Sequence, residues 1–314
     1  MEKTSRVYVA RHEDMVGAAI VRALRREGCE NIILRDQEQM DLSDEKQVGD
    51  FFKQERPEYV FCFAGPHGGI CHNVAYPADL IYLNLKIQCA VIHSAYKYGV
   101  KKLLFMAGSC GYPRESRQPI REDYFMEGKM EPTSIAYSTA KAAGIEMCQA
   151  YNRQYGVCFV PVALPNYYGA GDDYSDNGHV LAGVLRKIAA AAEDGSESVI
   201  LWGTGEPKRQ FMYVDDLADA VVLIMNRYQE TALINAAGGY EFTIAEMAEK
   251  IKEIAGYKGF VVFDISKPDG AARKLLDHSK LLSLGFREKI SFDQGLRLIY
   301  EDYMTTFTGK GGTE

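Results

Sequence analysis

The stretch VYVARHEDMVGAAIVRALRREGCE, residues 7–30, combines two hydrophobic periodicities. Its first residues form a short apolar run, as in a buried strand, and residues 15–28 repeat apolar side chains at helical spacing. A tight turn joins the two. In dinucleotide-binding sheets such a unit comes first, and the pyrophosphate meets the N-terminus of its helix. Where that turn would normally carry three glycines, this chain has Arg11, Asp14 and Gly17.

The same alternation of strand and helix extends over the first half of the chain. The β-rich runs are 6–10, 31–35, 58–65, 101–108 and 157–165, and the helical patterns are 15–28, 43–57, 77–99 and 136–156. We therefore predict an α/β fold of the Rossmann type, a doubly wound parallel sheet with helices on both faces. Ligands of such sheets bind beyond the carboxyl ends of the strands, so functional residues should lie in the loops that follow the strands.

The second half has a looser rhythm, with loops rich in Gly and Asp. Its recognisable segments are a helical pattern at 179–195, a strand at 199–203, a final helix at 292–307 and the loose tail TGKGGTE. We expect two domains. Residues 1–165 form a dinucleotide-binding domain, completed by segments within 208–238, and residues 166–314 form a smaller C-terminal region that binds the substrate.

Composition excludes several classes of protein. The chain has 314 residues, 47% of them hydrophobic, but it has no apolar run of the ~20 residues that span a bilayer and no signal peptide, so we expect a cytoplasmic protein. Its seven cysteines include no C-x-x-C pair, which argues against a disulfide framework and a metal site. The net charge of −7 is spread along the chain, which makes nucleic acid an unsuitable partner.

Two polar motifs surround the end of the fourth predicted strand. Tyr137 and Lys141, in IAYSTAK, lie four residues apart at the start of a helix and so share one face. An ammonium beside a phenol stabilises the phenolate, which would let the tyrosine exchange a proton with a substrate oxygen near neutral pH. The spacing alone also fits a solvated helix, but the segment AGSCGYP at 107–113 ends the preceding strand and supplies further polar groups.

Long, specific runs of this sequence resemble the GDP-L-fucose synthases, which are GDP-4-keto-6-deoxymannose 3,5-epimerase/4-reductases of the extended short-chain dehydrogenase/reductase superfamily. The runs are GGI (68–70), YPADLIYLN (76–84), KLLFMAGSCGYP, EPTSIAYSTAKAAGIEMCQAYNRQYG, WGTGEPKRQFMYVDD and KPDGAARKLLD. They cover nearly the whole chain. The resemblance implies the same fold, a GDP-sugar substrate and the cofactor NADP(H).

The resemblance also implies roles for four side chains. The family's reductive pair falls on Tyr137 and Lys141, and its epimerisation pair falls on Cys110 and His179. The chemistry agrees with these roles, because a 4-keto group acidifies the protons on C3 and C5, and a thiolate and an imidazolium can exchange protons on opposite faces of the ring. Taken singly, Cys110 could be a small buried hydrophobe and His179 a helix-capping or surface histidine.

The remaining family contacts concern the two ligands and the partner. The GDP-sugar contacts fall on Lys187 (arginine in the family), Trp202, Arg209, Asp269 and Lys274. The cofactor contacts fall on Arg11, Asp14, Gly17, Gln37, Lys141 and Asn166. Trp202 could be plain core, but the following GTGEPKR favours a nucleotide pocket. The family suggests a homodimer through helices around 81–97 and 136–156, whose apolar residues could equally be internal core.

The departures from the family concentrate on the cofactor. Arg11 brings a Cβ into the tight turn, and Asp14 brings a carboxylate to the place of the pyrophosphate. Such a like-charge contact would cost up to about 4 kcal/mol at an effective dielectric constant near 20. Two arginines expected near the 2′-phosphate are replaced by Glu13 and Gln37. We therefore expect binding of NADP(H) to be weakened or absent.

The carbonyl-binding serine of the superfamily is also missing. Counting back from Tyr112, its position holds Gly108, and Ser109 should point to the opposite face of the strand. Losing one such donor typically costs about a hundredfold in rate.

The resemblance implies an enzyme with the family function, the epimerisation of a GDP-4-keto-6-deoxyhexose by Cys110 and His179 followed by NADPH-dependent reduction by Tyr137 and Lys141, and the departures at the cofactor turn put the reduction in question. Two alternatives stay open: an epimerase that no longer reduces its product, and a non-catalytic homologue that binds a GDP-sugar. Consumption of NADPH, exchange of sugar protons with solvent, and binding alone distinguish the three.

Overall fold

A six-stranded parallel sheet organises the first half of the protein. The computed structural model describes residues 1–63, 65–175 and 177–308, so the end of the predicted tail lies outside the described residues. In spatial order the strands of this sheet are β2 (Asn31–Ile33), β1 (Arg6–Ala10), β3 (Tyr59–Cys62), β4 (Lys102–Gly108), β5 (Phe159–Leu164) and β9 (Ile234–Asn235). The strand order reverses between β1 and β3, which creates the crevice where ligands of such sheets bind.

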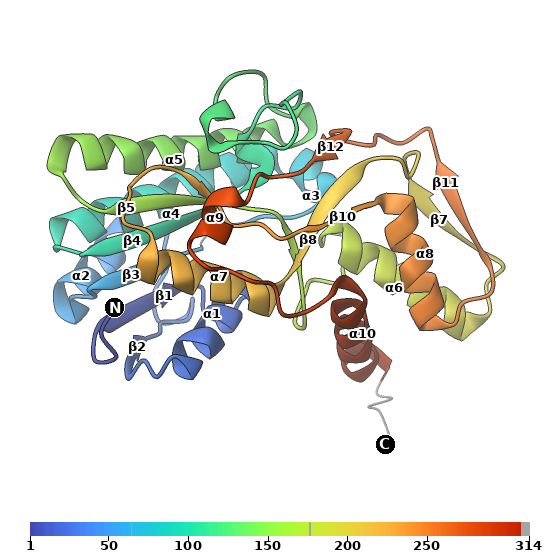
Figure 1. Ribbon diagram of the computed structural model, residues 1–314, viewed down its shortest axis with the longest axis horizontal. Helices are drawn as coiled ribbons and strands as arrows, with labels where there is room; N and C mark the ends of the chain where they lie inside the picture. Colours follow the sequence, from blue (N-terminus) through green and yellow to red (C-terminus); the bar gives the residue numbers. More distant parts are fainter. Residues whose placement is uncertain (64, 176, 309–314) are drawn as a thin grey trace.

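Helices cover both faces of this sheet (Figure 1). The helices are α1 (Met15–Arg26) and α7 (Val214–Arg227) on one face, and α2 (Glu45–Glu55), α4 (Pro77–Lys97) and α5 (Ile135–Tyr155) on the other. Alternate residues of β1 enter the two cores, Val7 on the side of α1 and Tyr8 on the side of α2. Because both faces are buried, the central strands are apolar throughout. The predicted Rossmann-type α/β fold is confirmed.

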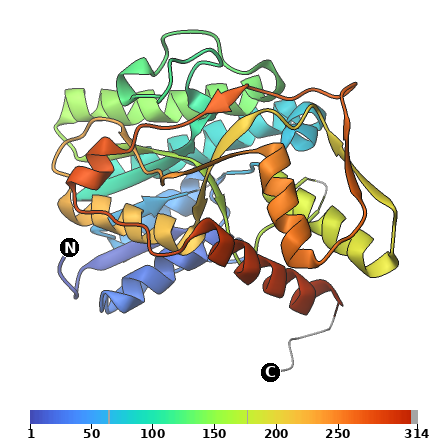
Figure 2. The same ribbon diagram turned by 45° about the vertical axis from the view of Figure 1, so that its right-hand side comes forward.

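The second half builds a smaller body beside the carboxyl ends of the strands (Figures 1 and 2). Its strands are β6 (Asn166–Tyr168), β8 (Lys208–Tyr213), β10 (Tyr240–Thr243) and β12 (Arg273–Lys274) in one sheet, and β7 (Ser198–Trp202) and β11 (Phe260–Asp264) in another. Its helices are α6 (Val180–Asp194), α8 (Ile244–Ala255), α9 (Ser279–Ser283) and α10 (Phe292–Tyr303). The chain returns to the first sheet through α7 and β9, so the two bodies share segments.

Short elements shape the loops around the crevice. They are α3 (Ile70–Ala75), the 3-10 turns Ser109–Gly111, Glu122–Tyr124 and Pro132–Ser134, and a π turn at Met304–Thr308.

Local capping residues determine where several of the longer helices begin. Asp44 caps α2 by accepting hydrogen bonds from the amides of Lys46 and Gln47, and Thr243 with Glu246 forms a capping box on α8.

Candidate active site

One cavity of about 650 Å³ collects the predicted catalytic and substrate residues. It lies between the two bodies, beyond the carboxyl ends of β4 and β5. The predicted residues that line it are Cys110, Tyr137, Asn166, His179, Lys187, Trp202, Arg209, Asp269 and Lys274. Lys141 lies beneath this surface with only 2% of its area exposed. The resemblance therefore identified side chains that the fold brings together from both halves of the chain.

Tyr137 stands in the first turn of α5, with Lys141 one turn further along. The ammonium nitrogen of Lys141 lies 5.6 Å from the ring centre of Tyr137. Burial lowers the pKa of Lys141 to about 8 and raises the pKa of Tyr137 well above its ordinary value, and the nearby thiol of Cys110 raises the latter further. The stabilisation of the phenolate that was inferred from the spacing of Tyr137 and Lys141 is therefore outweighed in the free protein. Tyr137 is a neutral O–H donor, because its desolvation outweighs the attraction of the lysine.

Gly108 ends β4 directly beside the reacting groups. A methyl group on its Cα would lie 3.4 Å from the sulfur of Cys110 and 3.8 Å from the phenol oxygen of Tyr137. The position expected to hold the carbonyl-binding serine thus faces the site, but it carries only hydrogen. The strand alternation used to dismiss Ser109 does not apply, because β4 ends at Gly108 and Ser109 begins a 3-10 turn that also lines the cavity.

His179 immediately precedes α6 and is enclosed by three side chains. Its ring stacks on His67, with centroids 5.5 Å apart, and meets the edge of Tyr167 at 5.2 Å. Its Nδ1 lies 3.8 Å from a carboxylate oxygen of Asp172. The ring makes no capping hydrogen bond to α6, so the helix-capping alternative does not describe its contacts.

His67 was not recognised from the sequence. Burial, together with the neighbouring His179, lowers its pKa to about 3, so its imidazole is neutral at physiological pH. Its position in AGPHGG, just after β3, was the available signal, since loops after strands were expected to carry function.

The opposite wall of the cavity is cationic. Arg209 on β8 and Lys274 on β12 are paired in the register of two parallel strands. Burial lowers the pKa of both side chains, so keeping two enclosed cations costs free energy that a bound anion would offset. Asp269 accepts hydrogen bonds from the amide and hydroxyl of Thr204, at 2.7 and 2.9 Å. The cationic side chains of Arg209 and Lys274 can hold a phosphate chain at this end of the cavity.

Trp202 and Lys187 flank this cationic wall. Trp202 is 45% exposed, so it is not plain core. The ammonium of Lys267 lies 5.4 Å from the centre of its ring, so a planar base could stack only on the other face of the indole or after Lys267 moves. The ammonium of Lys187 donates to the carbonyl oxygen of Ile200 at 3.3 Å.

The charged side chains of the turn after β1 pair with one another. Arg11 adopts a left-handed backbone conformation (φ 54°), which costs a residue with a Cβ about 1 kcal/mol. Its guanidinium lies 3.0 Å from Asp14 and 3.7 Å from Glu13. A methyl group on Gly17 would lie 2.1 Å from the carbonyl oxygen of Arg11, which explains the one glycine that is kept. The expected carboxylate at the turn is therefore present but paired.

A second cavity, of about 320 Å³, adjoins this turn. The side chains that line it include the carboxylates of Glu13, Asp14, Asp172 and Asp173, and Arg11 is paired with the first two of them. Gln37 is exposed and does not line this cavity. A dinucleotide would place its dianionic pyrophosphate among these carboxylates, so the residues present do not fit that group as they stand.

Among the described residues, no helix is long and apolar enough to cross a membrane.

Comparisons with known proteins agree on the type of protein. The model of the NAD dependent epimerase/dehydratase family matches residues 7–237. A putative GDP-L-fucose synthase 2 of Arabidopsis thaliana is 45% identical over 311 residues, which cover 99% of this chain and 95% of the relative.

Two solved structures from Campylobacter jejuni superpose over almost the full length. A GDP-6-OMe-4-keto-L-xylo-heptose reductase has a TM-score of 0.91 and 34% identity, covering 97% of this chain and 99% of its own. A GDP-mannoheptose C4 reductase with NADP bound has a TM-score of 0.87 and 36% identity, covering 96% of this chain and 99% of its own.

Proposed function

We infer the function from one premise, that this chain belongs to the NAD dependent epimerase/dehydratase family and, within it, to the GDP-L-fucose synthases. We propose that it acts on a GDP-linked 4-keto-6-deoxyhexose and epimerises the sugar at C3 and C5. The observation that supports this most is the single cavity in which Cys110, His179 and Tyr137 meet the buried cations Arg209 and Lys274.

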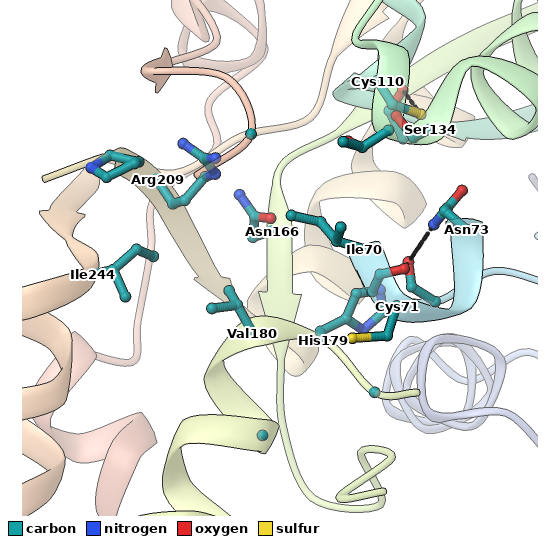
Figure 3. A pocket seen from close by; sticks show the side chains of 18 of the residues that line it. Ile70, Cys71, Asn73, Cys110, Ser134, Asn166, His179, Val180, Arg209 and Ile244 are labelled. Carbon is teal, nitrogen blue, oxygen red and sulfur yellow. Dashed lines mark hydrogen bonds between the residues drawn. The ribbon is translucent and has the colours of Figure 1, made fainter. Parts of the chain in front are cut away.

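The proposed epimerisation uses a base and an acid on opposite faces of the sugar. Cys110 and His179 enter the cavity from opposite sides in Figure 3. One group removes a proton from a carbon beside the carbonyl, and the electron pair moves onto the 4-keto oxygen to form an enolate. The other group returns a proton to the opposite face. The neutral phenol of Tyr137 donates a hydrogen bond to the enolate oxygen.

The GDP moiety is assigned to the cationic end of the cavity. Arg209 and Lys274 contact the diphosphate, the ring of Trp202 stacks on the base, and Lys187 and Asp269 complete the pocket. A diphosphate bound there would offset the free-energy cost of enclosing two cations. Binding of the nucleotide would therefore stabilise the pocket.

Solvent exchange tests this proposal. In D₂O, the purified protein should place deuterium at C3 and C5 of GDP-4-keto-6-deoxymannose without any added dinucleotide. Mass spectrometry and proton NMR locate the label. An absence of deuterium in sugar that is demonstrably bound would exclude epimerisation.

Epimerisation without reduction is the second candidate function. Reduction of the 4-keto group by Tyr137 and Lys141 requires NADP(H) in the neighbouring cleft, where Glu13 and Asp14 oppose the pyrophosphate. We therefore expect the cofactor to bind weakly and reduction to be slow or absent. Oxidation of NADPH in the presence of the 4-keto sugar would instead support the complete synthase reaction.

Three further properties belong to the same proposal. Residues 1–165, with segments of 208–238, form the dinucleotide domain, and 166–314 bind the GDP-sugar. Exposed Tyr82 and Tyr155, on α4 and α5, support a homodimer through these two helices. A cytoplasmic location would keep the catalytic thiol reduced.

A further inference from the structure

We propose that Asp172 is a positioning residue for His179: its carboxylate holds the imidazole with Nδ1–H toward itself, so that Nε2 exchanges the proton with the sugar. This inference rests on the proposed epimerisation, because it explains how one of the two exchanging groups is oriented. Nothing in the sequence motif singled out Asp172, which lies seven residues before His179 in a loop rich in Gly and Asp.

The first support is the geometry of the two side chains. The nearest carboxylate oxygen of Asp172 lies 3.8 Å from Nδ1 of His179. The side chain of Asp172 is only 3% exposed, whereas that of His179 is 28% exposed and lines the sugar cavity. The buried carboxylate thus lies behind the ring, and the opposite nitrogen is left for the substrate. The separation of 3.8 Å is longer than a hydrogen bond, and shortening it by less than about 1 Å would give the contact through which a carboxylate selects a histidine tautomer.

The second support is an unsatisfied oxygen. Oδ1 of Asp172 accepts a hydrogen bond from the amide of Asp173 at 2.8 Å. Its buried Oδ2 has no hydrogen-bond partner among the described residues. A buried acceptor of a charged group that has no hydrogen-bond partner is destabilised, because it has lost its hydration and gained nothing in return. The oxygen that lies 3.8 Å from Nδ1 of His179 is Oδ1, so Oδ2 gains Nδ1–H as its donor only when the carboxylate or the ring turns, and that turn would satisfy the unpaired oxygen.

The third support is that the loop carrying Asp172 is anchored. Asp302, on α10, accepts hydrogen bonds from the amide of Gly171 and the hydroxyl of Tyr174, both at 3.0 Å. The amide of Asp172 donates to the carbonyl oxygen of Gly169 at 3.2 Å. Hydrogen bonds therefore fix the chain on both sides of Asp172 in the sequence, as is required of a residue that positions another group.

The aromatic neighbours restrict the ring without competing for its charge. His67 stacks on one face of His179, and Tyr167 meets the ring at an angle of 71°. Because the pKa of His67 lies near 3, that neighbour stays neutral and does not repel an imidazolium. Among the described residues, Asp172 is the acidic side chain that lies against His179.

The chemical role follows from the proton balance. When His179 acts as the base, a C–H bond of the sugar breaks, its electron pair forms the enolate and the proton goes to Nε2. The ring is then positive, and the carboxylate of Asp172 stabilises the proton that remains on Nδ1. When His179 returns the proton from Nε2, the neutral Nδ1–H tautomer is restored.

The test reads the tautomer directly. Protein labelled with ¹⁵N-histidine contains only six histidines, and the His179→Asn variant assigns the signals of His179. Above the titration of the ring, the chemical shifts should show a proton on Nδ1 of His179 in the native protein, and this preference should be lost in Asp172→Asn. A native ring protonated on Nε2 would overturn the proposal, even if no variant could be prepared.

Kinetics supply the second arm. Asp172→Asn should lower kcat for deuterium exchange about 10- to 100-fold with KM changed less than threefold, and Asp172→Glu should restore part of the loss. Asp173→Asn removes the same charge from the neighbouring exposed residue and should keep kcat within threefold. Unchanged kcat in Asp172→Asn would overturn the proposal. If native protein exchanges no proton but shows the Nδ1–H tautomer, the proposed epimerisation fails while the positioning of His179 stands.

Discussion

The two halves of the crevice use their charges in opposite ways. In the sugar half, Arg209 and Lys274 are enclosed cations on neighbouring strands, and a bound anion would stabilise both. In the dinucleotide half, the cation Arg11 is already paired with Asp14, and Glu13 adds a further negative charge. The sugar half therefore has cations available for a phosphate chain. In the dinucleotide half, acidic side chains of the turn already neutralise the cation. If the proposed weak binding of the dinucleotide holds, a few residues of a single turn would be enough to change one binding site of this sheet and leave its neighbour intact.

The largest expected effect lies in the sugar half. Cys110→Ser and His179→Asn should each lower the rate of deuterium exchange about 10²- to 10⁴-fold, because each removes one of the two proton-transferring groups. Binding of GDP should stay within a few-fold of native, since the cations are untouched. Exchange measured by NMR in D₂O checks the loss, and persistent exchange in both variants would make the pair structural.

The cationic wall should give the next largest effect. Lys274→Met should weaken binding of GDP about 10- to 100-fold, the value of one hydrogen bond to a charged group at about 1.5–3 kcal/mol. Lys208→Met is a matched control, because Lys208 is an exposed lysine on the same strand as Arg209. Calorimetry measures both. Equal affinities for the two variants would remove Lys274 from the nucleotide site.

The turn after β1 should respond in a non-additive way. Arg11→Gly alone leaves the carboxylate of Asp14 without its partner, so binding of NADPH should not improve. Arg11→Gly with Asp14→Gly removes both the side chain in the tight turn and the carboxylate, and affinity should rise about tenfold, or ~1.4 kcal/mol. A fluorescence titration with NADPH follows all three proteins. A gain from Arg11→Gly alone as large as from the pair would contradict the role given to the ion pair.

The smallest effect concerns Lys141, which lies between the two halves. Its folded pKa of about 8 is below the unfolded value of 10.5. Between these two pH values, the unfolded chain binds more protons at this lysine than the folded protein does. The free energy of unfolding therefore increases as the pH rises through this range. Below about pH 8 the lysine is charged in both states, and the full cost of burying its charge is present. Stability of native protein relative to Lys141→Met should therefore increase from pH 8 to 10, with a slope of at most ~1.4 kcal/mol per pH unit. Urea unfolding at several pH values measures it, and parallel curves would show that Lys141 is hydrated.

The sequence predicted the central sheet well for a physical reason. Strands such as β4 and β5 are buried on both faces, so they appear as continuous apolar runs between helical patterns. The strands β10 and β11 of the second body are half-exposed and contain no buried residue, so their periodicity is too weak to separate them from loops. Strand β8 is buried over its last four residues but begins with the polar residues Lys208, Arg209 and Gln210, which hide the apolar run.

The site was only partly predictable. Cys110, His179 and the cationic residues were found through motif resemblance, which fixes positions but not contacts. The pairing of Arg11 with Asp14 depends on a left-handed backbone at Arg11, which no local preference of arginine indicates. Similarly, Asp172 lies against His179 only through the folding of the loop that carries both, and His67 reaches His179 only through the packing of the loop after β3 against that loop. A stabilised phenolate was inferred for Tyr137 because the sequence shows its lysine neighbour but not its desolvation.

Calorimetric titration of one protein preparation with GDP and, separately, with NADPH tests the contrast between the two halves most directly. We predict that GDP binds with a dissociation constant in the micromolar range and that NADPH binds at least about a hundredfold more weakly, a difference of ~2.7 kcal/mol. NADPH bound as tightly as GDP would show that Arg11, Glu13 and Asp14 accept a pyrophosphate, and would contradict the account of a closed dinucleotide half.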